Sequence, residues 1–345
     1  MGGRSIPTIL PPVRSEPLSD RQFRRVCDSY RNHIEKRLRT LTDHSGPGWV
    51  YEPVRYALSG GGKRIRSLLV LFSCEAVGGD PRRALNAAAA MEILHNFTLV
   101  HDDVMDNAEL RRGKPTVHKR WSANAAILSG DELVALAYRA MLQTDSPRLP
   151  EILRVFTESF VEVCEGQALD KEFELRRGIS LDEYLRMIGK KTGRIIGASA
   201  EVGALLGGAR PAETAALRRF GEHLGRAFQI RDDLLDIVGT VGEFGKEIGS
   251  DVREKKKTYM FVVASGRARG KDRAFLASIP RLNRITQGVI GRVRNIYEAT
   301  GALEKAARAI ERSTASALRS LQPIGRGKGK DSLLALARLL LERVS

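Results

Sequence analysis

The sequence predicts an all-α protein whose single domain is a bundle of helices. Apolar residues recur at spacings of three and four along most of the chain, which is typical of amphipathic helices. Alternation of apolar and polar residues, which would indicate half-buried strands, is nearly absent. Residues that favour turns separate the periodic segments at 78–80, 145–150, 207–211 and 239–249. We therefore expect long helices joined by short turns.

The elements follow in order from a flexible, proline-rich N-terminal arm over residues 1–18. A first helix is expected to begin at Asp20 and to continue to about residue 41, because its apolar residues keep a helical spacing. Further helices are predicted at about 50–58, 65–77, 83–106, 122–143, 150–175, 181–206 and 211–239. Beyond residue 257 the pattern is again helical, with a looser basic connection at 325–330. No change in composition marks a second domain, so residues 19–345 are expected to form one.

The overall composition narrows the classes of partner. With 345 residues and 42% hydrophobic content, the chain can bury a sizeable core. Its net charge of +16 favours acidic partners: nucleic acid, an anionic membrane surface or phosphorylated small molecules. Three widely spaced cysteines without a CxxC pair argue against a disulfide framework and a zinc site. Because no signal core and no apolar run of about 20 residues is readable, we expect a cytoplasmic protein with, at most, peripheral membrane contact.

Two similar clusters of aspartates carry the strongest functional signal. They are HDDVMD, with Asp102, Asp103 and Asp106, and RDDLLD, with Asp232, Asp233 and Asp236. On a helix, the first and last aspartates of each cluster share one face. Buried carboxylates without partners are costly, so two such faces across a cavity would be explained by hard divalent cations. Mg²⁺ binds a few carboxylates together with waters and substrate phosphates. Two solvated acidic helix faces are the alternative, which the apolar flanks and the basic motifs disfavour.

Basic segments accompany the aspartates. Residues 60–66 read GGGKRIR, in which glycines allow close approach of a phosphate and Lys63, Arg64 and Arg66 supply donors. A flexible basic turn is the alternative. The segment RRGKPTVH begins at Arg111, about two helical turns beyond the first cluster if that helix continues. A nucleic-acid patch would usually interleave aromatic residues, which make up only 6% of this chain.

Shorter motifs lie between and after the two clusters. GQALD contains Gln167 and Asp170, and KTG contains Lys191 and Thr192. Lys246 and a run of three lysines at 255–257 follow the second cluster. Each of these alone would more often be structural than functional.

Taken together, the motifs resemble those of the trans-isoprenyl diphosphate synthases of the polyprenyl synthetase family. GGGKRIR, HDDVMD with RRGKPTVH, GQALD, KTG, FQIRDDLLD, GKEIGSD and REKKKT occur in that family's order and approximate spacing over residues 30–345. The resemblance implies an all-α bundle around a deep central cavity, usually in a homodimer. It also implies Mg²⁺-assisted condensation of isopentenyl diphosphate with an allylic diphosphate, namely dimethylallyl, geranyl or farnesyl diphosphate, and no nucleic-acid partner.

The resemblance further implies roles for individual residues. Mg²⁺ would be bound by Asp102, Asp106 and Asp232, supported by Asp103, Asp233 and Asp236. The allylic diphosphate would be held by Arg111, Lys191 and Lys256, with Lys246 closing over it. Isopentenyl diphosphate would be held by Gly62, Lys63, Arg66, His95 and Arg112. From the positions of Thr192 and Gln229 in the motifs, we also hypothesise that their neutral dipoles, with backbone carbonyls, stabilise the allylic cation. The family commonly has glycine where this chain has Lys255, so it stays open which lysine of 255–257 reaches the diphosphate.

Product length is expected to depend on the residues one turn before the first cluster. Phe97 and Thr98 precede Asp102 by five and four residues, so they would lie below the metals, where a growing chain descends. A single aromatic followed by a small residue resembles geranylgeranyl diphosphate synthases of the archaeal type, which make a C20 product. C15 products and products of C25 or longer remain alternatives, and Phe97 is alternatively a core residue.

Two other functions are less consistent with the motifs. A class I terpene cyclase also has an aspartate-rich helix, but its second metal motif normally resembles NSE or DTE, whereas this chain has RDDLLD. A non-catalytic partner subunit should have lost aspartates or diphosphate-binding cations, and here both sets are present. The sequence therefore favours a catalytic, chain-elongating enzyme.

Overall fold

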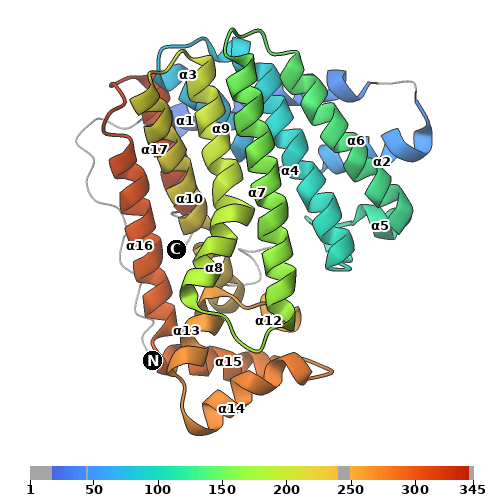
Figure 1. Ribbon diagram of the computed structural model, residues 1–345, viewed down its shortest axis with the longest axis vertical. Helices are drawn as coiled ribbons and strands as arrows, with labels where there is room; N and C mark the ends of the chain where they lie inside the picture. The colour runs from blue at the N-terminus through green and yellow to red at the C-terminus, as the bar shows by residue number, and fades with distance from the viewer. Residues whose placement is uncertain (1–17, 44–45, 240–248, 342–345) are drawn as a thin grey trace.

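The computed structural model describes residues 18–43, 46–239 and 249–341, and it confirms the all-α prediction (Figure 1). All of the predicted N-terminal arm except Leu18 lies outside the described residues, as does Lys246. Within the described part of the chain, the only strands are β1 (Leu110–Arg111) and β2 (Lys114–Pro115), which pair antiparallel. The remaining regular structure is helical.

The first half of the chain folds into helices that are mostly long. Its helical elements are α1 (Asp20–Thr42), α2 (Gly48–Ser59), α3 (Ile65–Ala76), the 3₁₀ turn η1 (Pro81–Ala84), α4 (Leu85–Met105), α5 (Val117–Arg120), α6 (Ala123–Leu142) and α7 (Leu149–Leu175). Helix α1 begins with a capping box, in which Ser19 and Gln22 each accept a backbone N–H of the other.

The second half continues with shorter pieces and one long helix. Its helical elements are α8 (Leu181–Ile188), the π-helical turn η2 (Gly189–Gly193), α9 (Arg194–Leu206), α10 (Pro211–Val238), α12 (Ser250–Arg253), α13 (Tyr259–Arg267), α14 (Gly270–Ser278), the 3₁₀ turn η3 (Ile279–Arg281), α15 (Gln287–Ala299), α16 (Ala302–Ser320) and α17 (Lys328–Leu341). The segment predicted as one helix over 181–206 is thus three pieces. The basic connection predicted at 325–330 is also shorter, because α17 already begins at Lys328.

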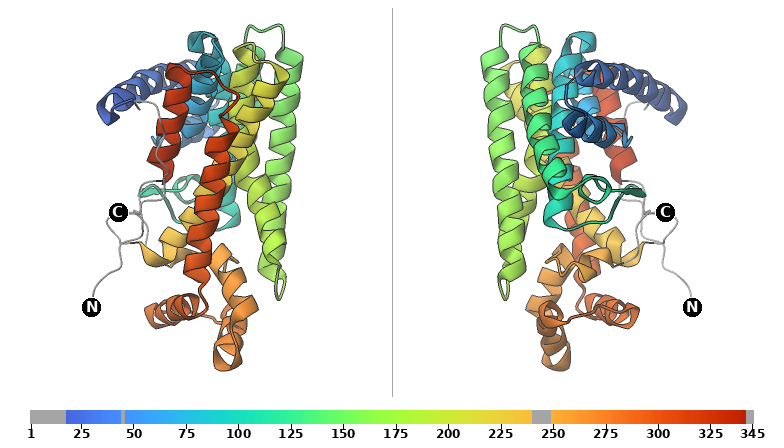
Figure 2. Two further views of the ribbon diagram at one scale, coloured as in Figure 1. Left: turned by 90° about the vertical axis from the view of Figure 1, so that its left-hand side faces the viewer. Right: turned by 90° about the vertical axis from the view of Figure 1, so that its right-hand side faces the viewer.

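Long helices form the body of the molecule. Helix α9 packs against α3, α4, α7 and α10, and α10 packs against α16 on its other side. In Figure 1 these helices run along the long axis, while α13, α14 and α15 gather at one end. Figure 2 shows the same separation from both sides, with the loop that joins α6 to α7 at the opposite end. The long helices therefore form the core of the molecule, and α13, α14 and α15 form a smaller region at one end of its long axis.

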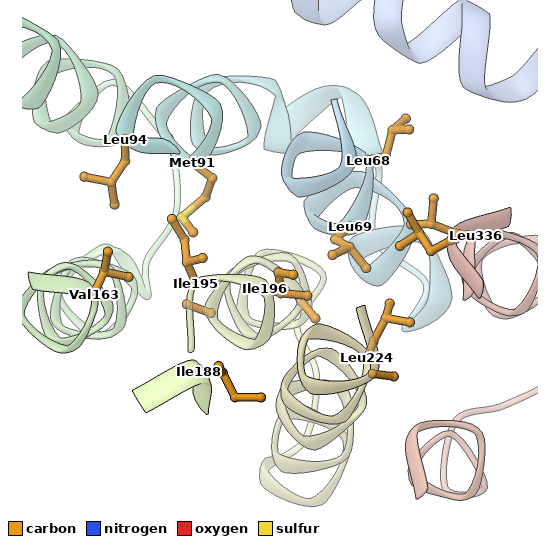
Figure 3. Packing of buried hydrophobic residues seen from close by; sticks show 14 of the residues in the cluster. Leu68, Leu69, Met91, Leu94, Val163, Ile188, Ile195, Ile196, Leu224 and Leu336 are labelled. Carbon is orange, nitrogen blue, oxygen red and sulfur yellow. The ribbon is translucent and has the colours of Figure 1, made fainter. Parts of the chain in front are cut away.

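The core consists of aliphatic side chains between these helices. Figure 3 shows Leu68 and Leu69 of α3, Ile196 of α9, Leu224 of α10 and Leu336 of α17 in one layer. All five are buried, so the helices are held by apolar burial rather than by intrinsic propensity. None of the described helices is long and apolar enough to cross a membrane.

Candidate active site

A cavity of about 770 Å³ opens between the helices of the body and the segment after α12. This volume lies in the range of typical small-molecule sites. Its lining includes, from the predicted site residues, Arg66, His95, Thr98, Asp102, Asp106, Arg111, Arg112, Lys191, Thr192, Gln229, Asp232, Asp233 and Lys256. The tertiary structure therefore brings segments far apart in the sequence to one place.

The first aspartate cluster reaches the cavity from the end of α4. Asp102 and Asp106 line the cavity, as their shared helix face predicts. Both oxygens of Asp106 accept from ammonium groups, with Lys171 Nζ at 2.5 Å from Oδ1 and Lys256 Nζ at 3.4 Å from Oδ2. Burial opposes ionisation of Asp106, but these lysine charges outweigh burial and hold its pKa below the usual value. Asp102 has Lys191 Nζ at 4.0 Å.

The segment after the first cluster forms a hairpin that is not predicted from the sequence. Helix α4 ends at Met105, close to the predicted limit at residue 106, and Arg111 lies on the β1–β2 hairpin. Arg112 and Gly113 form the hairpin turn with φ of 55° and 74°, the left-handed pair that a tight two-residue turn requires. The hairpin brings Arg111 back to Asp103, whose Oδ1 accepts from Arg111 Nε at 3.0 Å and Nη2 at 2.5 Å. Asp103 is thereby buried beside the cavity and does not line it.

The three aspartates of the second cluster also differ in their surroundings. Asp232 is exposed and lines the same cavity from α10. Asp233 lines the cavity too, although it is only 5% exposed, whereas Asp236 is 4% exposed and is not among the lining residues. Asp236 accepts from the Ser250 hydroxyl at 2.6 Å and from the backbone N–H groups of Ser250 and Asp251 at 3.1 Å each. It therefore fixes the start of α12 rather than facing the cavity.

Asp233 joins a chain of hydrogen bonds that ends at Thr192. Its Oδ2 accepts from the Tyr184 hydroxyl at 2.6 Å and the Tyr259 N–H at 3.0 Å, and its Oδ1 accepts from Gln229 Nε2 at 3.0 Å. The Gln229 carbonyl oxygen in turn accepts from the Thr192 hydroxyl at 2.9 Å. Burial raises the pKa of Asp233 to about 6 against these hydrogen bonds. The chain fixes the orientation of the Gln229 amide at the cavity wall.

A second, basic side of the cavity is built on GGGKRIR and α4. Arg66, His95 and Arg112 line it together. Burial lowers the pKa of Arg66 to about 10, and its buried Nε has no hydrogen-bond partner among the described residues. Burial and the neighbouring Arg66 and Arg112 charges lower the pKa of His95 well below its ordinary value. Arg112 Nη1 donates to the Gly61 carbonyl, and a Cβ on Gly62 would lie 3.0 Å from this nitrogen. Because Gly62 has no side chain, it leaves room for the guanidinium group of Arg112.

Arg64, which the sequence offers as a phosphate donor, is instead a structural residue. It is 2% exposed and donates to Glu35 Oε1 at 2.7 Å, to Glu92 Oε1 at 3.2 Å and to the Leu58 carbonyl at 2.7 Å. The three acceptors, one for each nitrogen of the guanidinium group, hold Arg64 inside the helical core. Lys63, like Gly62, is not among the residues that line the cavity.

The three lysines after α12 point in different directions. Lys256 lines the cavity at the first aspartate cluster. Lys257 also borders the cavity, but its Nζ donates to backbone carbonyls at the end of α7. Lys255 Nζ donates to the Pro280 carbonyl at 3.1 Å, away from the site. Lys255 has a φ of 58°, a left-handed conformation that favours glycine, which is the residue the resemblance leads one to expect there. Geometry therefore favours Lys256.

The π-helical turn η2 positions the KTG motif. Lys191 Nζ donates to Asp170 Oδ2 at 2.7 Å, and Thr192 faces the cavity beside it. On α7, Gly166 lets this turn approach closely, because a Cβ there would overlap the backbone nitrogen of Lys191. Single π turns inside helices are frequent at functional sites. Here the turn faces the end of α4.

Of the two residues predicted to set product length, only one lines the cavity. Thr98 lines the cavity. Phe97 does not, and its ring packs edge-on against Phe160 of α7 at 5.3 Å and His101 at 4.7 Å between centroids. Figure 3 shows Met91 and Leu94 of α4 pointing toward Val163 and Ile195, two residues that line the cavity. Met91 and Leu94 thus lie just beyond its apolar wall.

The donor chemistry fits a divalent cation only together with an anionic ligand. Among the described residues, no group of three or more His, Cys, Asp or Glu side chains is placed to hold one metal ion. Asp102, Asp106 and Asp232 nevertheless present hard carboxylate oxygens to one cavity, and Arg66 Nε has no acceptor within the described part of the chain. Mg²⁺ usually keeps waters and takes one or two carboxylates plus substrate phosphates, so this set suits a shared Mg²⁺–diphosphate ligand.

Two residues beside the site are not predicted from the sequence. Tyr184 lines the cavity and donates to Asp233. Lys171 binds Asp106 from α7. The one sequence signal for Lys171 is its place directly after Asp170 in the GQALD motif, whereas nothing local marks Tyr184.

The geometry defines a class of helical enzymes in which aspartates from two helices and a group of basic residues line one cavity. Comparison with known proteins gives the family: the polyprenyl synthetase model matches residues 47–298, and the chain belongs to this family of prenyltransferases.

Individual relatives are similar to this protein in sequence or structure over most of the chain. A short chain isoprenyl diphosphate synthase of Methanothermobacter thermautotrophicus is 40% identical over 92% of this chain and 98% of its own length. A (2E,6E)-farnesyl diphosphate synthase of Mycobacterium tuberculosis is 42% identical over 76% of each chain. The crystal structure of a geranylgeranyl pyrophosphate synthetase from Pyrococcus horikoshii has a TM-score of 0.89 at 36% identity, covering 93% of this chain and 98% of that one.

Proposed function

We propose that this protein is a short-chain isoprenyl diphosphate synthase, which joins isopentenyl diphosphate to dimethylallyl, geranyl or farnesyl diphosphate and makes mainly geranylgeranyl diphosphate. The observation that carries the proposal is one cavity lined by carboxylates from two helices, by basic residues and by aliphatic residues. The relatives support a short-chain product, and they include both C20 and C15 synthases by name. Farnesyl diphosphate is therefore the second candidate product.

Basic residues of this chain would bind the two diphosphates, and acidic residues would bind the metal. Lys191, Lys256 and Arg111 face the cavity near the first cluster and would hold the oxygens of the allylic diphosphate. Arg66 and Arg112, beside neutral His95, would hold isopentenyl diphosphate on the basic wall. Mg²⁺ on Asp102, Asp106 and Asp232, when bound, would offset the charge that develops on the departing diphosphate. Lys246 would close over the allylic diphosphate, as the resemblance implies.

Loss of diphosphate leaves a cation on the allylic carbon, which the double bond of isopentenyl diphosphate attacks before a proton is lost to the released diphosphate. Thr192 and Gln229 present neutral oxygen dipoles at the cavity wall, and these stabilise a cation without being alkylated. Asp103 and Asp233 act by positioning, since Asp103 holds Arg111 and Asp233 holds Gln229.

A homodimer is part of the proposal. Exposed apolar side chains on α6 and α7 support it, namely Ile127, Leu128 and Val161 at 44%, 45% and 52% exposure. Apolar faces of this kind are common at subunit interfaces. Light scattering coupled to size-exclusion chromatography should give twice the monomer mass.

The decisive test is incubation with isopentenyl diphosphate and each allylic primer, with and without Mg²⁺, followed by chromatography of the dephosphorylated products. We expect Mg²⁺-dependent prenyl alcohols with the C20 alcohol predominant. Absence of any Mg²⁺-dependent prenyl product would contradict the proposal, and a cyclic hydrocarbon would favour a terpene cyclase instead.

A further inference from the structure

Among the residues that the structure describes, Lys171 is the cation in closest contact with Asp106, the last aspartate of the first cluster. Its Nζ lies 2.5 Å from Asp106 Oδ1 and 2.9 Å from Glu174 Oε1. The side chain of Lys171 is 30% exposed and that of Asp106 is 14% exposed, so the pair is partly shielded from water. Because water screens the pair less than it would in bulk solution, the electrostatic interaction between the Lys171 ammonium group and the Asp106 carboxylate is stronger.

Lys171 differs from the other lysines at the site in where it lies. Lys191 and Lys256 line the cavity, and carboxylates accept from their ammonium groups there. Lys171 is not among the lining residues and pairs with Glu174, one turn further along α7. A ligand that enters the cavity therefore meets Lys191 and Lys256, while Lys171 stays beside Asp106.

A fixed positive charge at a carboxylate weakens the binding of a second cation to that carboxylate. The repulsion between an ammonium group and a divalent cation is offset once the negative charges of a diphosphate are present beside them. We propose that Lys171 lowers the affinity of the first aspartate cluster for a free divalent cation, so that the cation binds tightly only together with the diphosphate. This inference rests on the proposed function, because it assumes that Asp106 receives the metal.

The test measures metal binding without turnover. Mn²⁺ is titrated into the full-length protein and its free concentration is followed by electron paramagnetic resonance, for wild type and Lys171→Met. We expect Lys171→Met to bind Mn²⁺ roughly three- to tenfold more tightly, as befits loss of one partly exposed charge contact. With saturating inorganic pyrophosphate, the difference between the two proteins should shrink. Unchanged or weaker Mn²⁺ binding by Lys171→Met, or no measurable binding by either protein, would overturn the inference.

Two further variants separate charge from geometry. Lys190 forms a comparable pair with Glu165 at 2.5 Å and does not line the cavity, so Lys190→Met should leave Mn²⁺ binding unchanged. Lys171→Arg changes the shape of the side chain but keeps its positive charge, and it should not tighten Mn²⁺ binding. Tightening by Lys190→Met or by Lys171→Arg would contradict a specific effect of the Lys171 charge. Circular dichroism without metal checks that each variant is folded.

The product assay keeps the two proposals apart. If wild type forms prenyl products with Mg²⁺ while Lys171→Met binds Mn²⁺ like wild type, only the inference about Lys171 fails. If wild type forms no prenyl product, the proposed function fails, whatever the titrations show.

Discussion

At the scale of single residues, members of one motif have different tasks. Asp102, Asp106 and Asp232 line the cavity, Asp233 lines it while holding Gln229, and Asp103 is buried beside it and holds Arg111. The helical spacing predicts that Asp102 and Asp106 share the cavity face, but it does not predict that Asp236 is absent from the lining. The hydrogen-bond partners of the others come from distant segments, which no local pattern reveals.

The orientation of the Gln229 amide leads to a first prediction. Because Gln229 Nε2 is held by Asp233 and its oxygen lies at Thr192, Gln229→Ala should remove a fixed dipole from the cation site. We expect the single-turnover rate to fall about tenfold to a hundredfold with folding preserved, somewhat less than for loss of an oxyanion-hole donor. Rapid-quench measurement at saturating substrates checks this, and a wild-type rate would exclude the role.

His95 gives a prediction about pH. Burial and the nearby arginines lower its pKa in the folded protein, so the unfolded chain binds the proton more readily. Stability should therefore be lost as the pH falls below about 6.5, where an ordinary histidine becomes charged. We expect the free energy of unfolding to depend less on pH between about 5 and about 6.5 in His95→Gln than in wild type. Urea unfolding at several pH values measures this, and equal pH dependence would show that His95 is not responsible.

At the scale of elements, helix positions follow closely from the sequence, but two local departures shape the site. The hairpin that follows the end of α4, which is not predicted, returns Arg111 to Asp103. The segment predicted as one helix over 181–206 contains the π turn that carries Lys191 and Thr192. Periodicity detects apolar faces over several turns, and it is insensitive to one extra residue in a single turn.

The close approach at Gly166 predicts the consequence of adding one methyl group. A Cβ would overlap the backbone of Lys191, so Gly166→Ala should push the π turn away from α7. We expect a loss of stability of about 1–3 kcal/mol, with lower affinity for the allylic substrate. Gly189 begins the same turn, and a Cβ added to it would meet no described atom within 4 Å, so Gly189→Ala serves as the control. Denaturant unfolding and KM distinguish them, and equal behaviour of the two variants would contradict the packing argument.

At the scale of the whole molecule, the cavity exists because α4, α7 and α10 meet around it. The two aspartate clusters stand on α4 and α10, which come together only through the packing of α9 between them and of the segment after α12 against their ends. The depth of the cavity is set by the same packing. Phe97, which the sequence favours as its floor, instead lies against Phe160.

Product length is the property that this depth should control. We expect Phe97→Ala to shift the products toward longer chains, because loss of its ring loosens the packing of α4 against α7 behind the cavity wall. Leu94→Ala, which shortens a side chain that points toward Val163, is the comparison. Chromatography of radiolabelled products measures the distribution. If Phe97→Ala leaves it unchanged and Leu94→Ala lengthens it, the chain is stopped by Leu94 and the prediction for Phe97 is wrong.

The sequence by itself determined the all-α class, the approximate limits of most helices and the family. These properties reside in apolar periodicity and in short motifs, which are local. Only the tertiary structure decided that Arg64 is bound to Glu35 and Glu92 in the core, that Lys256 rather than Lys255 turns to the cavity, and that Lys171 contacts Asp106. The physical reason is that the direction and partner of a charged side chain depend on which distant helices pack beside it.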